Sequence, residues 1–228
     1  MLTEISYVMS PSIPKWPANP SEISYITQSL EKGDPCNASS VYHHMHNGTH
    51  VDAPKHFSKN GKGIVDIPID DFYYSAPLVI NLKKNKGELI TRDDLARFQS
   101  EIMKADILCI YTGYSDLRLQ DPSAYVDNFP SFSVEAAQYL RFSFPFLKAI
   151  ALDVISVDNA ITGPSKGFPV HKAFLECLSE QDPRTLLLFE DVNLKKMTEI
   201  QEHIKAICAF PVRWESAEAA PVGMVVIS

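Results

Sequence analysis

The segment HNGTHVDAPKHF, from His46 to Phe57, constrains the local fold more than any other part of the chain. Its first two histidines, His46 and His50, are four residues apart, a spacing that would place both on one face of a helix. Gly48 lies between them and Pro54 follows, and both residues disfavour a continuous helix. We therefore predict a strand that runs into a turn.

An extended backbone in this segment would gather polar side chains at one point. Alternate residues of a strand point the same way, so His50 and Asp52 would share one face while Val51 enters the opposite packing layer. Gly48 allows the backbone to bend, and such a bend would bring His46 toward the same point.

The chemistry of these side chains indicates a metal site. Five of the seven histidines lie between His43 and His56, a density that neither solubility nor loop packing requires. Imidazole nitrogen and carboxylate oxygen together suit borderline divalent ions such as Zn²⁺ or Mn²⁺, whereas a thiolate site would use cysteine. The alternative is a polar loop, or an accidental run that binds metal only as a purification tag does. The order of His, His, Asp and His around Gly and Pro is too structured for a tag.

The histidines other than His46, His50 and His56 have weaker claims to function from their local sequence. For His43 and His44 we expect one solvated and one packed ring, and for His203 a surface or boundary position. His171 lies at the expected start of a helix, where a neutral ring could face a ligand.

The apolar pattern predicts a β-rich first third followed by alternating strands and helices. Strand-like segments are expected near residues 4–8, 23–30, 39–46, 77–82, 107–112, 149–154, 185–189 and 222–227. Thr91 and Ser133 each precede a helical pattern, as N-cap residues do. Two more helices are expected over residues 170–179 and 199–207. The Pro-rich opening from Pro11 to Pro20 is expected to be an extended arm that covers a neighbouring site.

Composition favours a soluble enzyme. The 228 residues, 45% of them hydrophobic, can bury a substantial core, and we expect one domain over residues 1–228. A formal net charge of -7 and a sequence pI near 5.5 disfavour nucleic acid and anionic membrane as partners. No apolar run approaches the roughly 20 residues that span a bilayer, and no secretion signal is evident, so we expect a cytoplasmic location. The four cysteines are scattered singly and should be reduced thiols, with Cys109 a small core residue.

The histidine motif resembles the signature H-x-G-T-H-x-D-x-P-x-H-F of the metal-dependent cyclase family, which includes bacterial kynurenine formamidase and isatin hydrolase. The resemblance continues along nearly the whole chain in the family order. It is carried by SYVMSPSIPKWPANP with Trp16, ILCIYTGYSD with Tyr114 where a tryptophan is more usual, KAIALDVISVDNA with Ser156 and Asp158, FPVHKAFL with His171, LLLFEDVNL with Glu190, and the tail AFPVRWESAEAAPVGMVVI.

This resemblance implies a swivelling β/β/α fold with two divalent ions per chain, zinc being the expected metal and manganese the alternative. The implied ligands are His46, His50, Asp52 and Glu190 for one ion, and Asp52, His171 and Glu190 for the other, so that Asp52 and Glu190 bridge. Glu190 also follows the apolar run 186–189, where a parallel strand would end, although an ordinary loop or helix-start acid is the alternative. The interval from His171 to Glu190 carries the polar insert ECLSEQDPR, longer than the family's compact version.

The same resemblance implies an amide hydrolase in which the two ions hold a hydroxide and polarise the carbonyl that it attacks. His56 is the expected proton shuttle, with a further ligand or a ligand-orienting group as the alternatives. Trp16 is the expected aromatic wall for a planar substrate, or else it packs an oligomer interface.

An N-formyl aromatic amine such as N-formylkynurenine is the expected substrate of this arylformamidase-like enzyme. An isatin hydrolase-like enzyme for cyclic amides or lactones is the alternative activity, and a non-catalytic metal-binding relative is the alternative of another class. We expect a small-molecule substrate, no nucleic-acid or membrane partner, and assembly as a homodimer or homotetramer.

Overall fold

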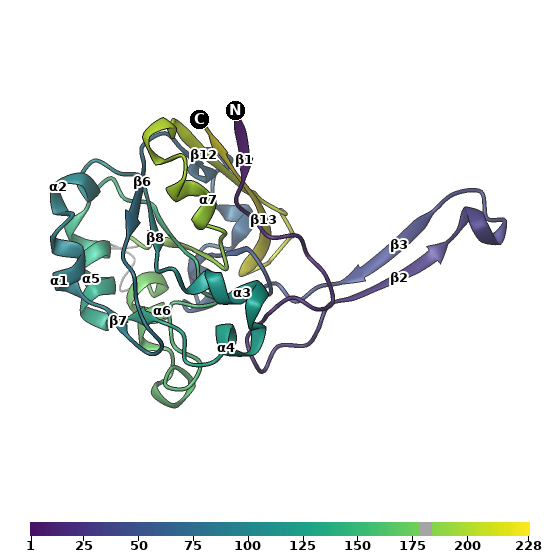
Figure 1. The fold of residues 1–228 in the computed structure, drawn as a ribbon, viewed down its shortest axis with the longest axis horizontal. Helices are drawn as coiled ribbons and strands as arrows, with labels where there is room; N and C mark the ends of the chain where they lie inside the picture. Colours follow the sequence, from purple (N-terminus) through teal and green to yellow (C-terminus); the bar gives the residue numbers. More distant parts are fainter. Residues whose placement is uncertain (178–183) are drawn as a thin grey trace.

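In the computed structural model, which describes residues 1–177 and 184–228, a mixed β-sheet forms the centre of the molecule (Figure 1). Its strands follow the order β5-β12-β13-β4-β11-β10-β8-β6, and β1 pairs with β13 beside this path. They are β1 (Leu2–Glu4), β4 (His50–Asp52), β5 (Tyr73–Tyr74), β6 (Pro77–Asn81), β8 (Ile107–Tyr111), β10 (Ala149–Leu152), β11 (Leu187–Glu190), β12 (Ala206–Pro211) and β13 (Ala219–Ile227).

Strand β4 joins two halves of this sheet. On one side β6, β8, β10 and β11 run parallel to one another, and on the other side β13, β12 and β5 pair antiparallel. Strand β4 pairs antiparallel with both β11 and β13. Because Glu190 is the register partner of His50, this junction brings the end of β11 beside the histidine motif.

Two smaller sheets and a set of short helices complete the described fold. The smaller sheets are β2 (Ile23–Gln28) with β3 (Ala38–Tyr42), and β7 (Leu89–Ile90) with β9 (Ser131–Phe132). The α-helices are α1 (Arg92–Ala96), α2 (Gln99–Ile102), α3 (Leu117–Gln120), α4 (Pro122–Val126), α5 (Val134–Ser143), α6 (Pro169–Leu175) and α7 (Lys195–Thr198). The 3-10 turn η2 (Pro54–His56) directly follows β4.

Alternate residues of the parallel strands enter two separate cores. Leu108 and Ile110 of β8 pack with residues of α1, α5 and α6, whereas Ile107 and Cys109 of the same strand pack with residues of β12 and β13. This is the arrangement expected for strands that are covered on both faces. Figure 1 shows α1, α2 and α5 together on the side of β6 and β8, and the antiparallel strands at the opposite end.

The predicted mixed α/β fold class is confirmed, and so are most of the predicted strands and helices. Thr91 and Ser133 are N-caps whose side chains accept from the backbone N–H of Asp94 and Ala136. The single helix predicted after Thr91 is observed as α1 and α2, and the first strand lies at residues 2–4 instead of 4–8. Helix α6 ends at Leu175, and the far end of the predicted 170–179 helix lies outside the described residues.

The helix predicted over residues 199–207 is wrong, because the chain forms the 3-10 turn η7 (Gln201–His203) and then enters β12. Ile207 is fully buried and pairs with Val226 of β13 and with Tyr74 of β5. Strand pairing on both sides thus overrides the local helical pattern. No helix in the described part of the chain is long and apolar enough to cross a membrane.

Strands β2 and β3 form a hairpin that projects far from the rest of the molecule (Figure 1). All residues of β2 are exposed, and those of β3 are exposed or half-buried. This hairpin spans residues 23–42, and residues 43–45 connect it to the histidine motif.

Candidate metal centre

The local backbone places His46, His50 and Asp52 as the sequence predicts. Gly48 has a φ of +66°, a left-handed conformation that glycine adopts without the penalty of a Cβ. A Cβ on Gly48 would also lie 2.5 Å from the sulfur of Met9, but that flexible side chain can move aside, so the positive φ is the reason for glycine here. Val51 enters the second core with no exposed surface, while His50 and Asp52 point together on the other face of β4.

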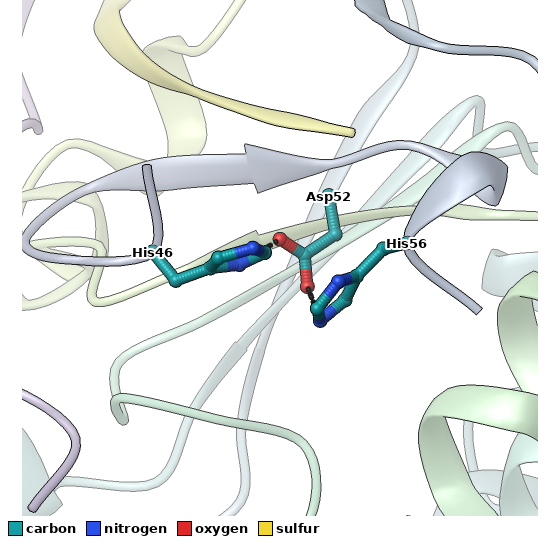
Figure 2. Close-up of side chains that lie close together, drawn as sticks. All are labelled: His46, Asp52 and His56. Carbon is teal, nitrogen blue, oxygen red and sulfur yellow. Dashed lines mark ion pairs between the residues drawn. The ribbon is translucent and has the colours of Figure 1, made fainter. Parts of the chain in front are cut away.

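Asp52 lies at the centre of four imidazoles and is fully buried. The nearest approaches to its carboxylate are 2.9 Å from His46 Nδ1, 3.4 Å from His50 Nε2, 3.7 Å from His171 Nε2 and 4.0 Å from His56 Nε2. Figure 2 shows the rings of His46 and His56 on either side of this carboxylate. Burial would raise the pKa of Asp52, but the surrounding imidazoles hold that pKa well below its usual range.

Glu190 and His171 close the other side of the cluster. Glu190 lies at the end of β11, 3.4 Å from His50 Nε2 and 3.6 Å from His171 Nε2. Its Oε1 also accepts the backbone N–H of Val157 at 2.7 Å. Burial would raise the pKa of Glu190, but the two nearby imidazoles, His171 and His50, lower it. The carboxylate is therefore ionised and fixed in place.

Two of the imidazoles are oriented by partners on their far nitrogens. His50 Nδ1 lies 2.9 Å from the carbonyl oxygen of Gly48, and His171 Nδ1 lies 2.7 Å from a carboxylate oxygen of Asp158. In both rings Nε2 then faces the acidic cluster. This is the arrangement by which proteins orient histidine ligands of metals.

The surroundings of His171 and His56 shift the pKa values of these two rings in opposite directions. Burial opposes protonation of His171, but Asp158 and Glu190 raise its pKa to about 10. For His56 burial dominates and lowers the pKa to about 4, although Asp52 opposes the shift. His56 is therefore neutral near pH 7, and its side chain is 25% exposed, whereas that of His171 is 5% exposed.

The cluster forms one wall of a pocket of about 340 Å³. Aromatic side chains and Ile155 also line this pocket, together with the imidazole and acidic groups. The lining residues are Trp16, Asn19, His44, His46, His56, Phe57, Ile155, Ser156, Phe168, His171, Glu190 and Glu218. The Pro-rich opening thus contributes Trp16 and Asn19 to the pocket of its own chain.

The residues present fit a divalent cation. His50 Nε2 and both carboxylate oxygens of Asp52 are buried without a hydrogen-bond partner among residues 1–177 and 184–228. Although His46 Nδ1 is 2.9 Å from Asp52, the pair lacks hydrogen-bond geometry. A buried carboxylate left in this state is costly, and a cation bound between these atoms would remove the cost.

Two sets of donor atoms lie close enough to share an ion. In one set the atoms of His46, Asp52 and His56 lie within 4.8 Å of one another, and in the other those of His50, Asp52 and Glu190 do so. Asp52 belongs to both sets, in keeping with the bridging position expected for it. The first set includes His56, so its geometry suits a ligand as well as a proton carrier.

The site also contains residues that the sequence did not single out for a role. Asp158 orients His171 and accepts the backbone N–H of the same residue at 2.9 Å. Glu218 Oε1 lies 3.3 Å from His46 Nε2, and this hydrogen bond lowers the pKa of Glu218 to about 2. Phe168, in the pocket wall, has a φ of +55°, a strained conformation for a bulky residue of the kind that clusters at functional sites. The Ser-x-Asp turn is the sequence signal for Asp158. Glu218 has no such local signal, because it lies 172 residues from its partner His46.

His203 and the cysteines are as expected, but the expectation of one solvated ring among His43 and His44 is wrong, because both are half-buried. His43 packs against Glu22, whereas His44 lies in the pocket wall rather than in solvent. His203 is exposed. All four cysteines are free, and Cys109 is fully buried. Positions 178–183 of the polar insert between His171 and Glu190 lie outside the described residues.

Comparison with known proteins gives one family match and several full-length likenesses. A family model described as putative cyclase matches residues 3–159. The kynurenine formamidase of Geobacillus thermodenitrificans (strain NG80-2) is 29% identical over 180 residues, which cover 76% of this chain and 77% of that relative.

Solved structures share the fold at lower sequence identity. An isatin hydrolase bound to the product analogue thioisatinate superposes with a TM-score of 0.82 at 17% identity, covering 100% of this chain and 92% of that one. A predicted metal-dependent hydrolase from Bacillus stearothermophilus gives a TM-score of 0.73 at 19% identity, covering 99% and 97%. These likenesses show that the overall fold is that of the cyclase-family proteins.

Proposed function

Because this chain belongs to the cyclase family, we propose that it is a metal-dependent hydrolase of non-peptide C–N bonds, and that its substrate is an N-formyl aromatic amine such as N-formylkynurenine. One observation carries the proposal. The fully buried carboxylate of Asp52, without a hydrogen-bond partner in the described part of the chain, lies beside an aromatic-walled pocket.

The proposed metal ligands are His46, His50, Asp52, His171 and Glu190, and Asp52 and Glu190 would be the carboxylates shared between two divalent ions. Asp52 belongs to both donor sets, whereas Glu190 belongs to one and His171 to neither. Nitrogen and oxygen donors of this kind accept zinc, which we expect, or manganese. The chemistry that such ions supply when bound is polarisation of a carbonyl group and activation of water.

The reaction requires one proton transfer that the chain itself can carry out. A water molecule adds to the formyl carbon and the C–N bond breaks. One water proton ends on the nitrogen of the aromatic amine, and the other leaves with formic acid, which ionises to formate in solvent. We assign this transfer to His56, because its partly exposed ring lines the pocket beside the acidic cluster.

Aromatic side chains would hold the substrate ring in the pocket. The ring centroid of Trp16 lies 5.9 Å from that of Phe168 and 6.3 Å from that of Phe129. These neighbouring rings fix the indole at the pocket wall. A planar aromatic amine could stack there while its formyl group faces the acidic cluster. This arrangement supports Trp16 as a substrate-binding residue.

A cyclic amide fused to an aromatic ring is the second candidate substrate class. It has the same two parts, a flat ring and a polarisable carbonyl, and the isatin hydrolase of similar fold acts on such a compound. The aromatic wall favours this candidate over an aliphatic amide, but does not separate it from the formamide. A non-catalytic role would leave the accessible His56 ring without a purpose.

A hydrolysis screen tests the proposal. Protein stripped with a chelator and reloaded separately with zinc and manganese would be assayed on N-formylkynurenine, isatin, an aliphatic formamide and a simple lactone. We expect the highest kcat/KM on the N-formyl aromatic amine. Turnover of isatin alone would move the assignment to the cyclic amide class, and inactivity of both metal forms on every compound would reject a hydrolase.

A further inference from the structure

No lysine or arginine lines the pocket beside the metal centre in the described part of the chain. The charged side chains that do line it are the carboxylates of Glu190 and Glu218, together with imidazoles. Lys15, which precedes Trp16, donates to the carbonyl oxygen of Asn19 at 2.6 Å and is not among the lining residues. A substrate in this pocket therefore meets carboxylates and, from these residues, no ammonium or guanidinium group.

The two acids of the pocket differ in how far solvent reaches them. The side chain of Glu190 is 4% exposed and lies against His50 and His171, whereas that of Glu218 is 40% exposed. Of the two, Glu218 is the acid that a substituent of the substrate can reach without displacing a proposed metal ligand.

Strand pairing fixes Glu218 beside the histidine motif. The backbone N–H of Ala53 donates to the carbonyl oxygen of Glu218 at 2.9 Å, and the next residue, Ala219, is the register partner of Asp52. The side chain is directed by His46, whose Nε2 lies 3.3 Å from Oε1. The second oxygen, Oε2, accepts no hydrogen bond from another described residue. It is the atom available to a donor on the substrate.

Metal ions in the proposed centre would not give this region a positive excess. Two divalent ions would carry four positive charges. The carboxylates of the centre and the pocket offset these charges, and they belong to Asp52, Asp158, Glu190 and Glu218. A carboxylate on the substrate would therefore find no surplus counter-charge, and beside Glu218 it would be repelled.

The proposed substrate carries charges of both signs. N-formylkynurenine has its formamide on an aromatic ring, and a side chain on the same ring ends in an ammonium and a carboxylate group. With the ring against Trp16 and the formyl group at the metal centre, the side chain needs a further partner in the pocket wall. Glu218 is an accessible acid there, and hydrogen bonds between ammonium and carboxylate groups are among the stronger ones in proteins.

We propose that Glu218 is a specificity-determining residue that binds an ammonium group on the substrate and disfavours substrates whose only charged substituent is a carboxylate. This inference rests on the proposed function and narrows its substrate class to N-formyl aromatic amines with a cationic side chain. Glu218 makes and breaks no covalent bond, so it acts in recognition and not in the chemical step.

Three compounds that share one scaffold test the proposal. They are N-formylkynurenine, the analogue that lacks its carboxylate but keeps the ammonium group, and the analogue that lacks the ammonium group but keeps the carboxylate. For the metal-loaded wild type we expect kcat/KM to be roughly 10-fold or more higher on the ammonium analogue than on the carboxylate analogue. A ratio near one, or a preference for the carboxylate analogue, would overturn the proposal.

Glu218→Gln isolates the charge of this side chain. Glutamine has nearly the same shape and can still accept from His46, whereas the ratio between the two analogues should fall by roughly 3-fold or more. Both analogues are measured on one sample, so a partial loss of metal or of active protein cancels from that ratio. A ratio equal to that of the wild type would reject the role of Glu218.

Glu215→Gln is the matched control, because it removes the same charge three residues earlier in the chain. Glu215 is exposed and is not among the residues that line the pocket. The control should keep the ratio of the wild type. An equal fall in both variants would assign the preference to the overall surface charge and would contradict a specific site at Glu218.

Equilibrium binding separates a failure of this inference from a failure of the proposed function. The deformylated products of the three compounds keep the ring and the charged groups, and their Kd values, measured by titration calorimetry on metal-loaded protein, report recognition alone. The ammonium product should bind more tightly than the carboxylate product, and Glu218→Gln should narrow the difference. If this order holds while no N-formyl compound is hydrolysed, the ammonium site stands and the proposed function fails. Hydrolysis without any charge preference would reject the ammonium site and leave the function in place.

Discussion

Asp52 and Asp191 are both buried carboxylates beside Glu190, but hydrogen bonds satisfy only one of them. Asp191 accepts two bonds from Arg118, at 2.8 and 2.7 Å, and a third from the hydroxyl of Tyr125 at 2.7 Å. Asp52, equally buried, accepts none from residues 1–177 or 184–228. Burial of an acid is therefore not in itself evidence of function.

The difference assigns the two carboxylates to different tasks. The Asp191 pair is complete without any ligand, and Arg118 also lies 3.6 Å over the ring of Tyr7, so this region fixes the chain at the end of β11. The carboxylate of Asp52 lies among imidazoles and accepts no hydrogen bond from the described residues. This is expected of a metal ligand rather than of a structural acid.

Removal of divalent metal should have the largest effect on activity. Chelation should reduce hydrolysis of N-formylkynurenine to background, because polarisation of the carbonyl is then lost. Dialysis against zinc or manganese should restore it. Steady-state rates before and after reloading measure the effect, and undiminished turnover by protein shown by elemental analysis to be metal-free would contradict a metal-dependent reaction.

His56→Ala should retain its metal and lose turnover on the order of 100-fold to 10,000-fold, the usual contribution of a positioned acid or base. Metal content and kcat measured on the same sample separate the two roles that the geometry allows. If the variant is purified without metal, His56 is a ligand and its assignment as proton carrier is wrong.

Arg118→Met should destabilise the fold without changing metal content. Asp191 would be left as an unpaired buried charge, which costs about 3–5 kcal/mol of unfolding free energy. The same substitution at Arg92, whose pair with Glu135 is exposed, should cost about 1 kcal/mol or less. Urea unfolding of both variants measures these values, and equal losses would remove the distinction between the two pairs.

Trp16→Ala should have the smallest effect. A stacking wall binds ground state and transition state about equally, so its loss should raise KM several-fold while kcat changes little. Aromatic stacking contributes roughly 0.5–1.5 kcal/mol beyond area burial, which sets that scale. Steady-state kinetics on N-formylkynurenine measure both constants, and an unchanged KM would leave Trp16 with a packing role.

Local sequence rules identified the parts of the site that lie within a few residues of one another. The alternation of His50 and Asp52 follows from the period of a strand, and the bend at Gly48 follows from its missing side chain. The end of an apolar run fits Glu190 at the end of a strand, but its place in the site came from the family resemblance, because an ordinary loop acid fits that run as well. These inferences require no knowledge of which strands pair.

Contacts between distant segments could not be predicted in the same way. Arg118 and Asp191 are 73 residues apart, and nothing in either local sequence indicates the partner. The order of the sheet, with β4 between β11 and β13, creates such contacts. The same long-range pairing turned residues 206–207 into a strand where the local pattern favoured a helix.

The metal content of Asp52→Ala, measured against Asp191→Asn, tests the central claim most directly. Asn adopts the left-handed conformation of Asp191, whose φ is +52°, so the control keeps its backbone. Elemental analysis should find about two divalent ions per chain in the wild type and the control, and close to none in Asp52→Ala, as expected for a bridging ligand. Full metal retention by Asp52→Ala would contradict the bridge and with it the distinction between the two carboxylates.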